Sequence, residues 1–224
     1  MFELIASDAR FFVIAKHPGV SFHHQGEETG LVETARRQLG AIWPVHRLDR
    51  MTSGLMLLAR TPEVARQLSQ KLEARQVDKL YLALSDRKPA KKQGLVTGDM
   101  LKGRGGAWRL CASREQPAQT RFCSTSLAPG LRLFFLKPLT GKTHQLRVAL
   151  KSLGAPIIGD PLYHGAEPTP ADRGYLHAWS LRFELDGEHL HFMAPPQHGA
   201  LFLRADFQTL ISRPEWQPSA LVWP

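Results

Sequence analysis

The sequence predicts an α+β protein with a mixed, largely antiparallel β-sheet flanked by helices. Segments with the alternation of β-strands occur near both ends of the chain and between them. Helical segments are inserted among these strands at irregular intervals, unlike the regular alternation of a parallel α/β fold. The 224 residues have the length of one generous domain and contain no linker-like stretch. We therefore expect a single domain over residues 1–224.

The first half of the chain is expected to contain three strands and two helices. The strands cover residues 10–16, 55–59 and 79–85, and the helices cover residues 29–39 and a segment that begins at Thr61. Thr61 supplies a capping hydroxyl, and Pro62 suits the first helical position. Val64, Leu68 and Leu72 recur every four residues and give this helix an apolar face.

The second half is expected to contain two hairpins and two helices. The hairpin strands cover residues 118–127 with 131–139 and residues 175–185 with 188–193, and the helices cover residues 143–153 and 200–211. Asp186-Gly187 between two alternating segments is a strong hairpin signal. The glycine-rich residues 94–110 and the proline-rich residues 214–224 follow no clear pattern.

The charge of the chain indicates a polyanionic partner. Twenty-nine lysines and arginines against twenty acids give a formal net charge of +9 and a pI near 9.9. The sequence lacks the long basic amphipathic helix that would favour a lipid surface. Two cysteines cannot form a disulfide framework, and the N-terminal segment has no long apolar run. We therefore expect a cytoplasmic protein that does not enter a membrane.

Motifs for nucleotide cofactors and metals fail on inspection. Gly141-Lys142-Thr143 resembles the end of a phosphate-binding P-loop, but Leu136 stands where that motif needs its first glycine. His46-Arg47-Leu48-Asp49 differs in order from the HRD of a kinase catalytic loop. The histidines lack cysteines or acids at zinc-binding spacing. We expect neither a cofactor nor a metal.

The densest polar cluster is HRLDRMTSG at residues 46–54, directly before an apolar strand. A loop that leads into a buried strand is a rigid support for functional groups. Asp49 stands between two arginines, and nearby cations favour the ionised carboxylate, which can act as a nucleophile or stabilise a developing cation. From the local sequence alone, an aspartate that only closes a turn is the simpler interpretation.

Six motifs resemble those of the RluA-type pseudouridine synthases, and they occur in the order of that family. They are RFFVIAKHPGVSFHH at 10–24, HRLDRMTSG at 46–54, KLYLA at 79–83, LTGKTHQLRV at 139–148, GAPIIGDPLY at 154–163 and LHA at 176–178. Together they cover nearly the whole chain. The resemblance implies the pseudouridine synthase catalytic fold and the isomerisation of uridine in RNA without a cofactor.

The resemblance also implies roles for three side chains. Asp49 matches the catalytic aspartate, Arg147 the arginine that pairs with it, and Tyr81 the tyrosine that lies against the target base. His144, Arg147 and Lys151 have the spacing of one helix face, which agrees with a polar stripe. Tyr81 alternates with the leucines of its strand, so we expect an exposed ring.

Further residues of these motifs are expected to bind RNA. They are Lys16, His46, Arg47, Arg50, Thr52, Lys142, His144 and Gln145. Arg47 matches an arginine that displaces the target nucleotide from its stack in relatives, a step that a stacked base requires. Lys142 stands where the family usually has arginine, which keeps the charge but loses the planar fork.

The expected partner is a structured RNA, either rRNA or tRNA, bound by a monomer. Because the chain begins almost at the first motif, we expect no N-terminal accessory RNA-binding domain. The main alternative is a non-catalytic RNA-binding protein that keeps the fold. Such a protein would have little reason to retain both Asp49 and Arg147, so the sequence favours the enzyme.

Overall fold

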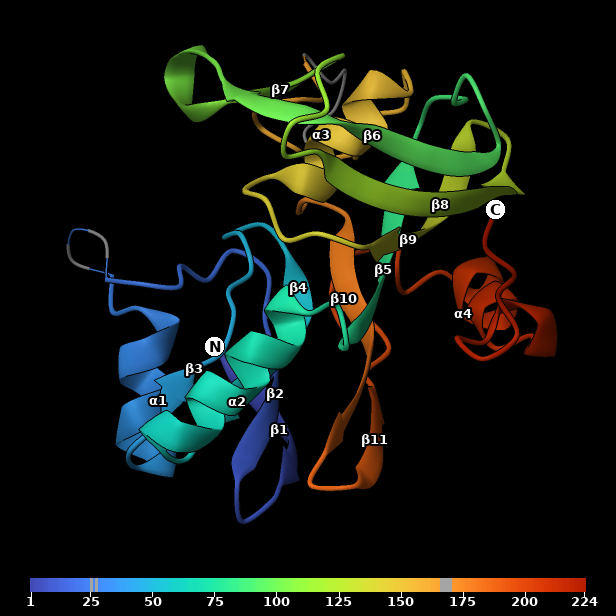
Figure 1. Cartoon of the computed structure of the whole chain (residues 1–224). Coiled ribbons are helices and arrows are strands. Elements are labelled where there is room, and N and C mark those ends of the chain that lie inside the picture. The colour runs from blue at the N-terminus through green and yellow to red at the C-terminus, as the bar shows by residue number, and fades with distance from the viewer. Residues whose placement is uncertain (25, 27, 166–170) are drawn as a thin grey trace. The chain divides into compact units, whose positions relative to one another are not determined.

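The predicted α+β class with largely antiparallel strands is confirmed (Figure 1). The computed structural model describes residues 1–24, 26, 28–165 and 171–224. Its strands are β1 (Phe2–Ser7), β2 (Phe11–Lys16), β3 (Trp43–Pro44), β4 (Ser53–Ala59), β5 (Asp78–Ser85), β6 (Gln93–Lys102), β7 (Trp108–Cys111), β8 (Ala118–Ala128), β9 (Leu131–Pro138), β10 (Leu176–Leu185) and β11 (Glu188–Met193). Its α-helices are α1 (Leu31–Leu39), α2 (Pro62–Glu73), α3 (Gln145–Ser152) and α4 (Ala205–Ile211).

The chain divides into two compact units, each made of two stretches of sequence. The first unit comprises Met1–Lys79 and His177–Pro196. The second unit comprises Leu80–Leu176 and Gln197–Pro224. Helices α1 and α2 belong to the first unit, and α3 and α4 belong to the second.

In the first unit, β4 lies between β2 and β10. It pairs antiparallel with β2 and in parallel with β10, through His177 opposite Ser53 and Ala178 opposite Gly54. β1 pairs antiparallel with β2, and β11 pairs antiparallel with β10. All seven residues of β4 are buried, as the apolar sequence of this strand predicts. The loop before β4 is therefore anchored by the most protected strand of this unit.

A hydrophobic core and α2 support this strand. The core consists of Phe11, Val13, Leu55, Leu57, Leu68, Val77, Leu181, Phe183, Leu185 and Ala194. Leu68 comes from α2, and Val64 and Leu72 pack against the same cluster. The predicted cap of α2 is confirmed, because the Thr61 hydroxyl accepts the Val64 N–H at 3.3 Å.

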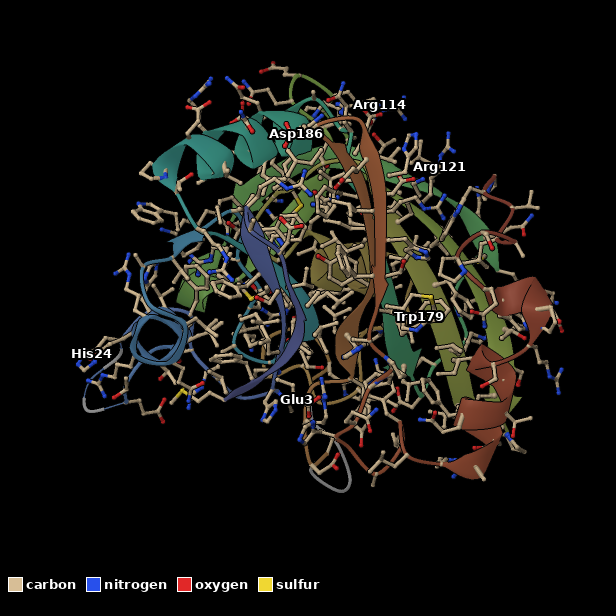
Figure 2. All side chains as sticks on the ribbon, turned by 90° about the horizontal axis from the view of Figure 1, so that it is seen from below. Glu3, His24, Arg114, Arg121, Trp179 and Asp186 are labelled. Carbon is tan, nitrogen blue, oxygen red and sulfur yellow. The ribbon has the colours of Figure 1, made fainter. Side chains whose placement is uncertain are left out.

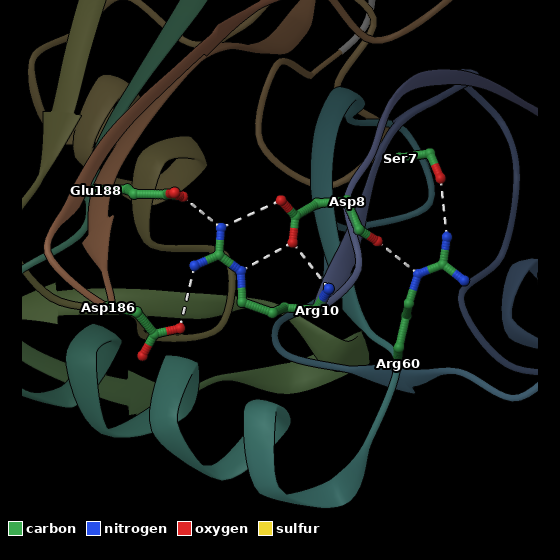
Figure 3. Close-up of polar contacts among 6 residues, drawn as sticks. All are labelled: Ser7, Asp8, Arg10, Arg60, Asp186 and Glu188. Atoms are coloured by element: carbon green, nitrogen blue, oxygen red, sulfur yellow. Dashed lines mark hydrogen bonds and ion pairs between the residues drawn. The ribbon is translucent and has the colours of Figure 1, made fainter.

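A cluster of charges around Arg10 joins the two hairpins of the first unit (Figure 3). The Arg10 guanidinium contacts Asp8 at 2.9 Å, Asp186 at 3.1 Å and Glu188 at 2.6 Å. Asp186 and Gly187 form the turn between β10 and β11 with positive φ angles of 52° and 82°. The predicted Asp-Gly hairpin is therefore confirmed.

In the second unit the strands follow the antiparallel order β5-β9-β8-β6-β7. Helix α3 contacts β7, β8 and β9, and α4 contacts β8. Residues 214–216, in a segment where no element was predicted, form a short 3-10 helix. Trp216 from this helix stacks on Phe135 with ring centroids 4.9 Å apart and planes 2° from parallel.

Several features of the fold differ from the sequence prediction. Strands β1 and β3 had no predicted counterpart, and the glycine-rich segment forms the β6–β7 hairpin. A Cβ atom on Gly98 of β6 would lie 2.3 Å from the Cys111 carbonyl oxygen, so glycine permits this close approach. The last helix begins at Ala205 because Arg204 has an extended backbone.

Candidate active site

Asp49 lies in the loop that connects β3 to β4 in the first unit. Its backbone carbonyl accepts the Thr52 N–H at 3.0 Å and closes a turn. Asp49 is half-buried, whereas Leu48 before it and Thr52 after it are buried. The turn and its two buried residues therefore hold the backbone of Asp49 from both sides.

The ammonium group of Lys16 binds the Asp49 loop to the loop after β2. Lys16 is 1% exposed, and its Nζ donates to the carbonyl oxygens of His17 at 2.9 Å, Val20 at 3.0 Å and Arg50 at 3.1 Å. A buried cation is tolerated only when its donors are satisfied, and three carbonyls meet that need. This geometry favours a positioning role for Lys16 over the phosphate contact predicted from the sequence.

The two arginines beside Asp49 have different surroundings. Arg50 Nε donates to the Gly19 carbonyl at 2.9 Å, and the Gly19 N–H donates back to the Arg50 carbonyl at 2.9 Å. Arg50 also pairs with Glu28 at 3.0 Å. Arg47 is exposed, with its guanidinium carbon 5.7 Å from the centre of the Phe22 ring. Arg50 thus braces the loop, while Arg47 lies where a bound RNA could contact it.

His46 fastens the start of the same loop to β4. Its Nε2 accepts the Leu57 N–H at 3.2 Å. Desolvation, reinforced by the charge of Lys79, lowers the pKa of His46 to about 3. The imidazole is therefore neutral at pH 7, as its acceptor role requires. The geometry favours a positioning role for this residue as well.

A buried hydrogen-bonded chain fixes the other end of the loop. His177 Nε2 donates to the Ala194 carbonyl at 2.7 Å, so its Nδ1 accepts the Ser53 hydroxyl at 2.7 Å. Gly54 follows with φ +106°, and a Cβ atom there would lie 2.2 Å from the Ala178 carbonyl oxygen. Only glycine therefore allows β4 and β10 to meet at this point.

In the second unit, Gln145 organises the loop that leads into α3. Its Oε1 accepts the Thr140 hydroxyl at 2.8 Å and the Lys142 N–H at 3.0 Å. Its Nε2 donates to the Gln119 carbonyl and to the Thr120 hydroxyl, each at 2.9 Å. Gln145 is buried, and its amide makes these four bonds within the protein. The geometry favours a positioning role over the RNA contact predicted for it.

His144 and Lys142 lie on the exposed side of this loop. His144 has a left-handed backbone with φ +56°, and its Nδ1 lies 2.9 Å from the Tyr163 hydroxyl. That hydroxyl also accepts the backbone N–H of Trp108 at 2.7 Å. Lys142 is exposed. The loop thus carries one exposed lysine and one half-buried imidazole held against Tyr163.

Arg147 forms a buried ion pair with Asp160. Its Nε and Nη2 contact the two carboxylate oxygens at 2.7 and 2.8 Å. The side chains of Arg147 and Asp160 are 5% and 0% exposed. Asp160 Oδ1 also accepts the N–H groups of Leu162 and Tyr163. Asp160 therefore fixes the plane of the guanidinium, and the pairing of Arg147 with Asp49 stays a prediction.

The expectation of an exposed Tyr81 ring is wrong. Tyr81 is 8% exposed, and it lies on β5 opposite Leu136 of β9. The alternation of β5 predicted one open face, but residues 80–85 are all buried. Both faces of this part of the strand are covered, as in strands at the centre of a sheet.

Four positioning residues had no role in the sequence prediction: Ser53, Asp160, Tyr163 and His177. Each falls inside a motif noted from the sequence, and each is buried despite its polar side chain. Their place inside a motif is the signal that could have identified them. Their partners lie far away in sequence, which no local pattern reveals.

The described ranges contain no group of three or more His, Cys, Asp or Glu side chains arranged to hold a metal ion. No helix in this part of the chain is long and apolar enough to cross a membrane. Cys111 and Cys123 are free thiols.

Comparison with known proteins agrees with this arrangement. A family model described as RNA pseudouridylate synthase matches residues 10–152. An "Uncharacterized RNA pseudouridine synthase" of Haemophilus influenzae is 48% identical over 90% of this chain and 91% of its own length. The "Ribosomal large subunit pseudouridine synthase C" of the same species is 31% identical over 88% of this chain and 66% of its own length.

A solved structure shares the fold. The structure titled "Human RNA Pseudouridylate Synthase Domain Containing 1" superposes with a TM-score of 0.73 at 26% identity, over 88% of this chain and 84% of that chain. The family match spans more than half of the residues and includes both the Asp49 loop and the loop that leads into α3. The chain therefore belongs to the RNA pseudouridylate synthase family, whose members are RNA-modifying isomerases.

Proposed function

We propose that the carboxylate of Asp49 is the catalytic group with which this protein converts uridine in RNA to pseudouridine. In this isomerisation the C1′–N1 bond breaks, C1′ bonds to C5, the C5 hydrogen leaves as a proton and N1 takes up a proton. Nothing is oxidised or reduced, so the reaction needs no redox cofactor. Attack at C1′, attack on the base and elimination are three routes that one held carboxylate could serve.

The observation that carries this proposal is the number of contacts that fix the Asp49 loop. The buried Lys16 ammonium, the neutral His46 ring and the Ser53–His177 pair each bind a different part of it. A turn of no function would not need a buried cation at its base, because burying that cation costs free energy. Preorganised supports of this kind are what a catalytic side chain requires.

The other assignments follow from the same proposal. We infer that Arg147, oriented by Asp160, pairs with Asp49 and holds the orientation of its carboxylate. We assign Tyr81 to the target base and Arg47 to displacement of the nucleotide from its stack. Lys142 and His144 are assigned to RNA contacts. Thr52, like Lys16, His46 and Gln145, is assigned to positioning, because it is buried.

The substrate is proposed to be ribosomal RNA or tRNA, since one relative is named for the large ribosomal subunit and another for tRNA. Since the Haemophilus relatives are bacterial, and bacterial ribosomal RNA is cytoplasmic, we propose that the protein acts in the cytoplasm. We also propose that it acts as a monomer. Mapping pseudouridines in RNA from strains with and without the protein identifies the modified molecule. Sedimentation of the purified protein tests the monomer.

The catalytic assignment is tested with RNA labelled by [5-³H]uridine and taken from a strain that lacks the protein. The wild-type protein should release tritium in the presence of EDTA, and Asp49→Asn should lose at least about a thousandfold of this rate while still binding RNA. Asp206→Asn, at a 39% exposed aspartate on α4, is the matched control. Equal release by wild type and Asp49→Asn would contradict the proposal and favour a non-catalytic RNA-binding protein.

A further inference from the structure

An open groove of about 420 Å³ lies on the second unit, beside the loop that leads into α3. Strands β6 and β7, the loop before β8 and the α3 loop supply its lining, which includes Asp99, Trp108, Glu115, Gln116 and Lys142. Its volume falls in the range of small-ligand sites, about 300–1,000 Å³. A single nucleotide is a ligand of this size class.

Trp108 gives the groove an aromatic wall. The residue is half-buried at the start of β7, opposite Lys102 of β6. Its backbone N–H is bound by the Tyr163 hydroxyl, which also contacts His144. The backbone at Trp108 is therefore tied to the loop that carries His144. An aromatic ring that lines a groove is a platform on which a nucleobase can stack.

The stretch of chain around Trp108, from the end of β6 to the loop after β7, is basic. Residues 102–114 contain Lys102, Arg104, Arg109 and Arg114, all exposed, and contain no aspartate or glutamate. Arg114, at the end of this segment, is labelled in Figure 2. Lys142 adds a further exposed cation to the groove itself. An aromatic ring in a groove with a cation, on a basic stretch of chain, is the pattern of proteins that bind single-stranded nucleic acid.

Two acids also line the groove and set the orientation of a ligand. Asp99 accepts the backbone N–H groups of Glu115 at 3.0 Å and Gln116 at 2.9 Å. The Ser113 hydroxyl and these N–H groups hold the pKa of the Asp99 carboxyl below its usual range. Asp99 and Glu115 would repel a phosphate near them, so a bound phosphate is expected nearer the cations of the hairpin and Lys142.

We propose that this groove binds one unpaired nucleotide of the RNA, other than the target uridine, with its base on Trp108 and its phosphate against Lys142 and the hairpin cations. The inference rests on the proposed function, because it takes RNA as the substrate. Stacking tolerates every base, so the site adds affinity for an unpaired segment without selecting a sequence. An acidic peptide would match the charge but would offer no base to the indole.

The affinity test uses the full chain and the same tritium-labelled RNA in single turnovers. Trp108→Ala should raise the protein concentration needed for half-maximal rate about 5- to 150-fold, the loss expected for one stacked base. The rate at saturating protein should stay unchanged. Trp108→Phe, which keeps an aromatic face, should retain most of the affinity. Trp223→Ala, at a half-buried tryptophan outside the groove, should behave as wild type.

A second measurement needs no variant. RNA that contains 4-thiouridine should crosslink on irradiation to the wild-type peptide that contains Trp108. Unchanged affinity of Trp108→Ala with normal tritium release, or crosslinks that avoid residues 99–116, would overturn the nucleotide site and leave the proposed function intact. RNA binding that depends on Trp108 without any tritium release would instead refute the isomerase and leave the site standing.

Discussion

The ion pair between Arg147 and Asp160 leads to a quantitative prediction about Asp160→Asn. Both side chains are almost fully buried, and the pair makes two charge-assisted hydrogen bonds of 2.7 and 2.8 Å. The asparagine keeps one oxygen for the N–H groups of Leu162 and Tyr163, but it presents an NH₂ group to a guanidinium N–H and leaves a buried cation uncompensated. Removing one partner of a buried ion pair costs about 3–5 kcal/mol of the free energy of unfolding.

Urea unfolding at pH 7 measures this loss. A double-mutant cycle with Arg147→Met separates the pair from its surroundings. The double variant should be more stable than the sum of the single losses predicts, by at least about 1 kcal/mol, because the second substitution removes a charge that the first left unpaired. Additive losses would show that the two residues are not coupled.

The same substitution should also slow the reaction. Where Asp160→Asn is still folded, its rate of single-turnover tritium release should fall by about 10- to 100-fold. The reason is that a misplaced Arg147 guanidinium no longer orients the Asp49 carboxylate with which we propose that it pairs. RNA affinity should change little. Destabilisation below about 1 kcal/mol together with wild-type activity would refute the argument that Asp160 positions Arg147.

Two further predictions concern the supports of the Asp49 loop. Between pH 6.5 and 3 the unfolded chain binds a proton at His46 that the folded chain does not. As the pH is lowered through this range, the free energy of unfolding should therefore decrease by up to about 1.4 kcal/mol per pH unit. His46→Asn should lose this dependence in urea titrations, and the same change at the exposed His189 should not. Gly54→Ala should cost more than about 2 kcal/mol, because its Cβ would lie 2.2 Å from a carbonyl oxygen. Gly130→Ala, also at positive φ but with open space around it, should cost about 1 kcal/mol in the same thermal melts, and equal losses would contradict the steric argument.

Local signals predicted the elements whose cause is local. The cap at Thr61 and the turn at Asp186-Gly187 depend on neighbouring residues, and both were confirmed. Strand β1 is less regular, with only partly buried and exposed residues, and its pairing with β2 is interrupted by a bulge. Because the side chains of such an edge strand are only partly buried, its sequence lacks the apolar run of a central strand.

The roles of the site residues depended on contacts that sequence spacing does not contain. Lys16 and Gln145 carry polar groups suited to RNA, yet these groups bind carbonyls and loops within their own units. Tyr81 alternates with leucines, yet its strand is covered on both faces. In each case the residue type indicated the polarity or shape of the side chain. Its role depended on the residues that contact it in the fold, which the sequence does not reveal.

The most direct test of the account is the amount of pseudouridine formed in a single turnover when the protein exceeds the RNA. Nucleoside analysis of the digested RNA should find nearly complete conversion of the target uridine by wild type. With Asp49→Asn at the same RNA occupancy it should find none, and with Asp206→Asn it should find conversion equal to wild type. Pseudouridine formed by Asp49→Asn within about tenfold of the wild-type rate would contradict the claim that the Asp49 carboxylate performs the reaction.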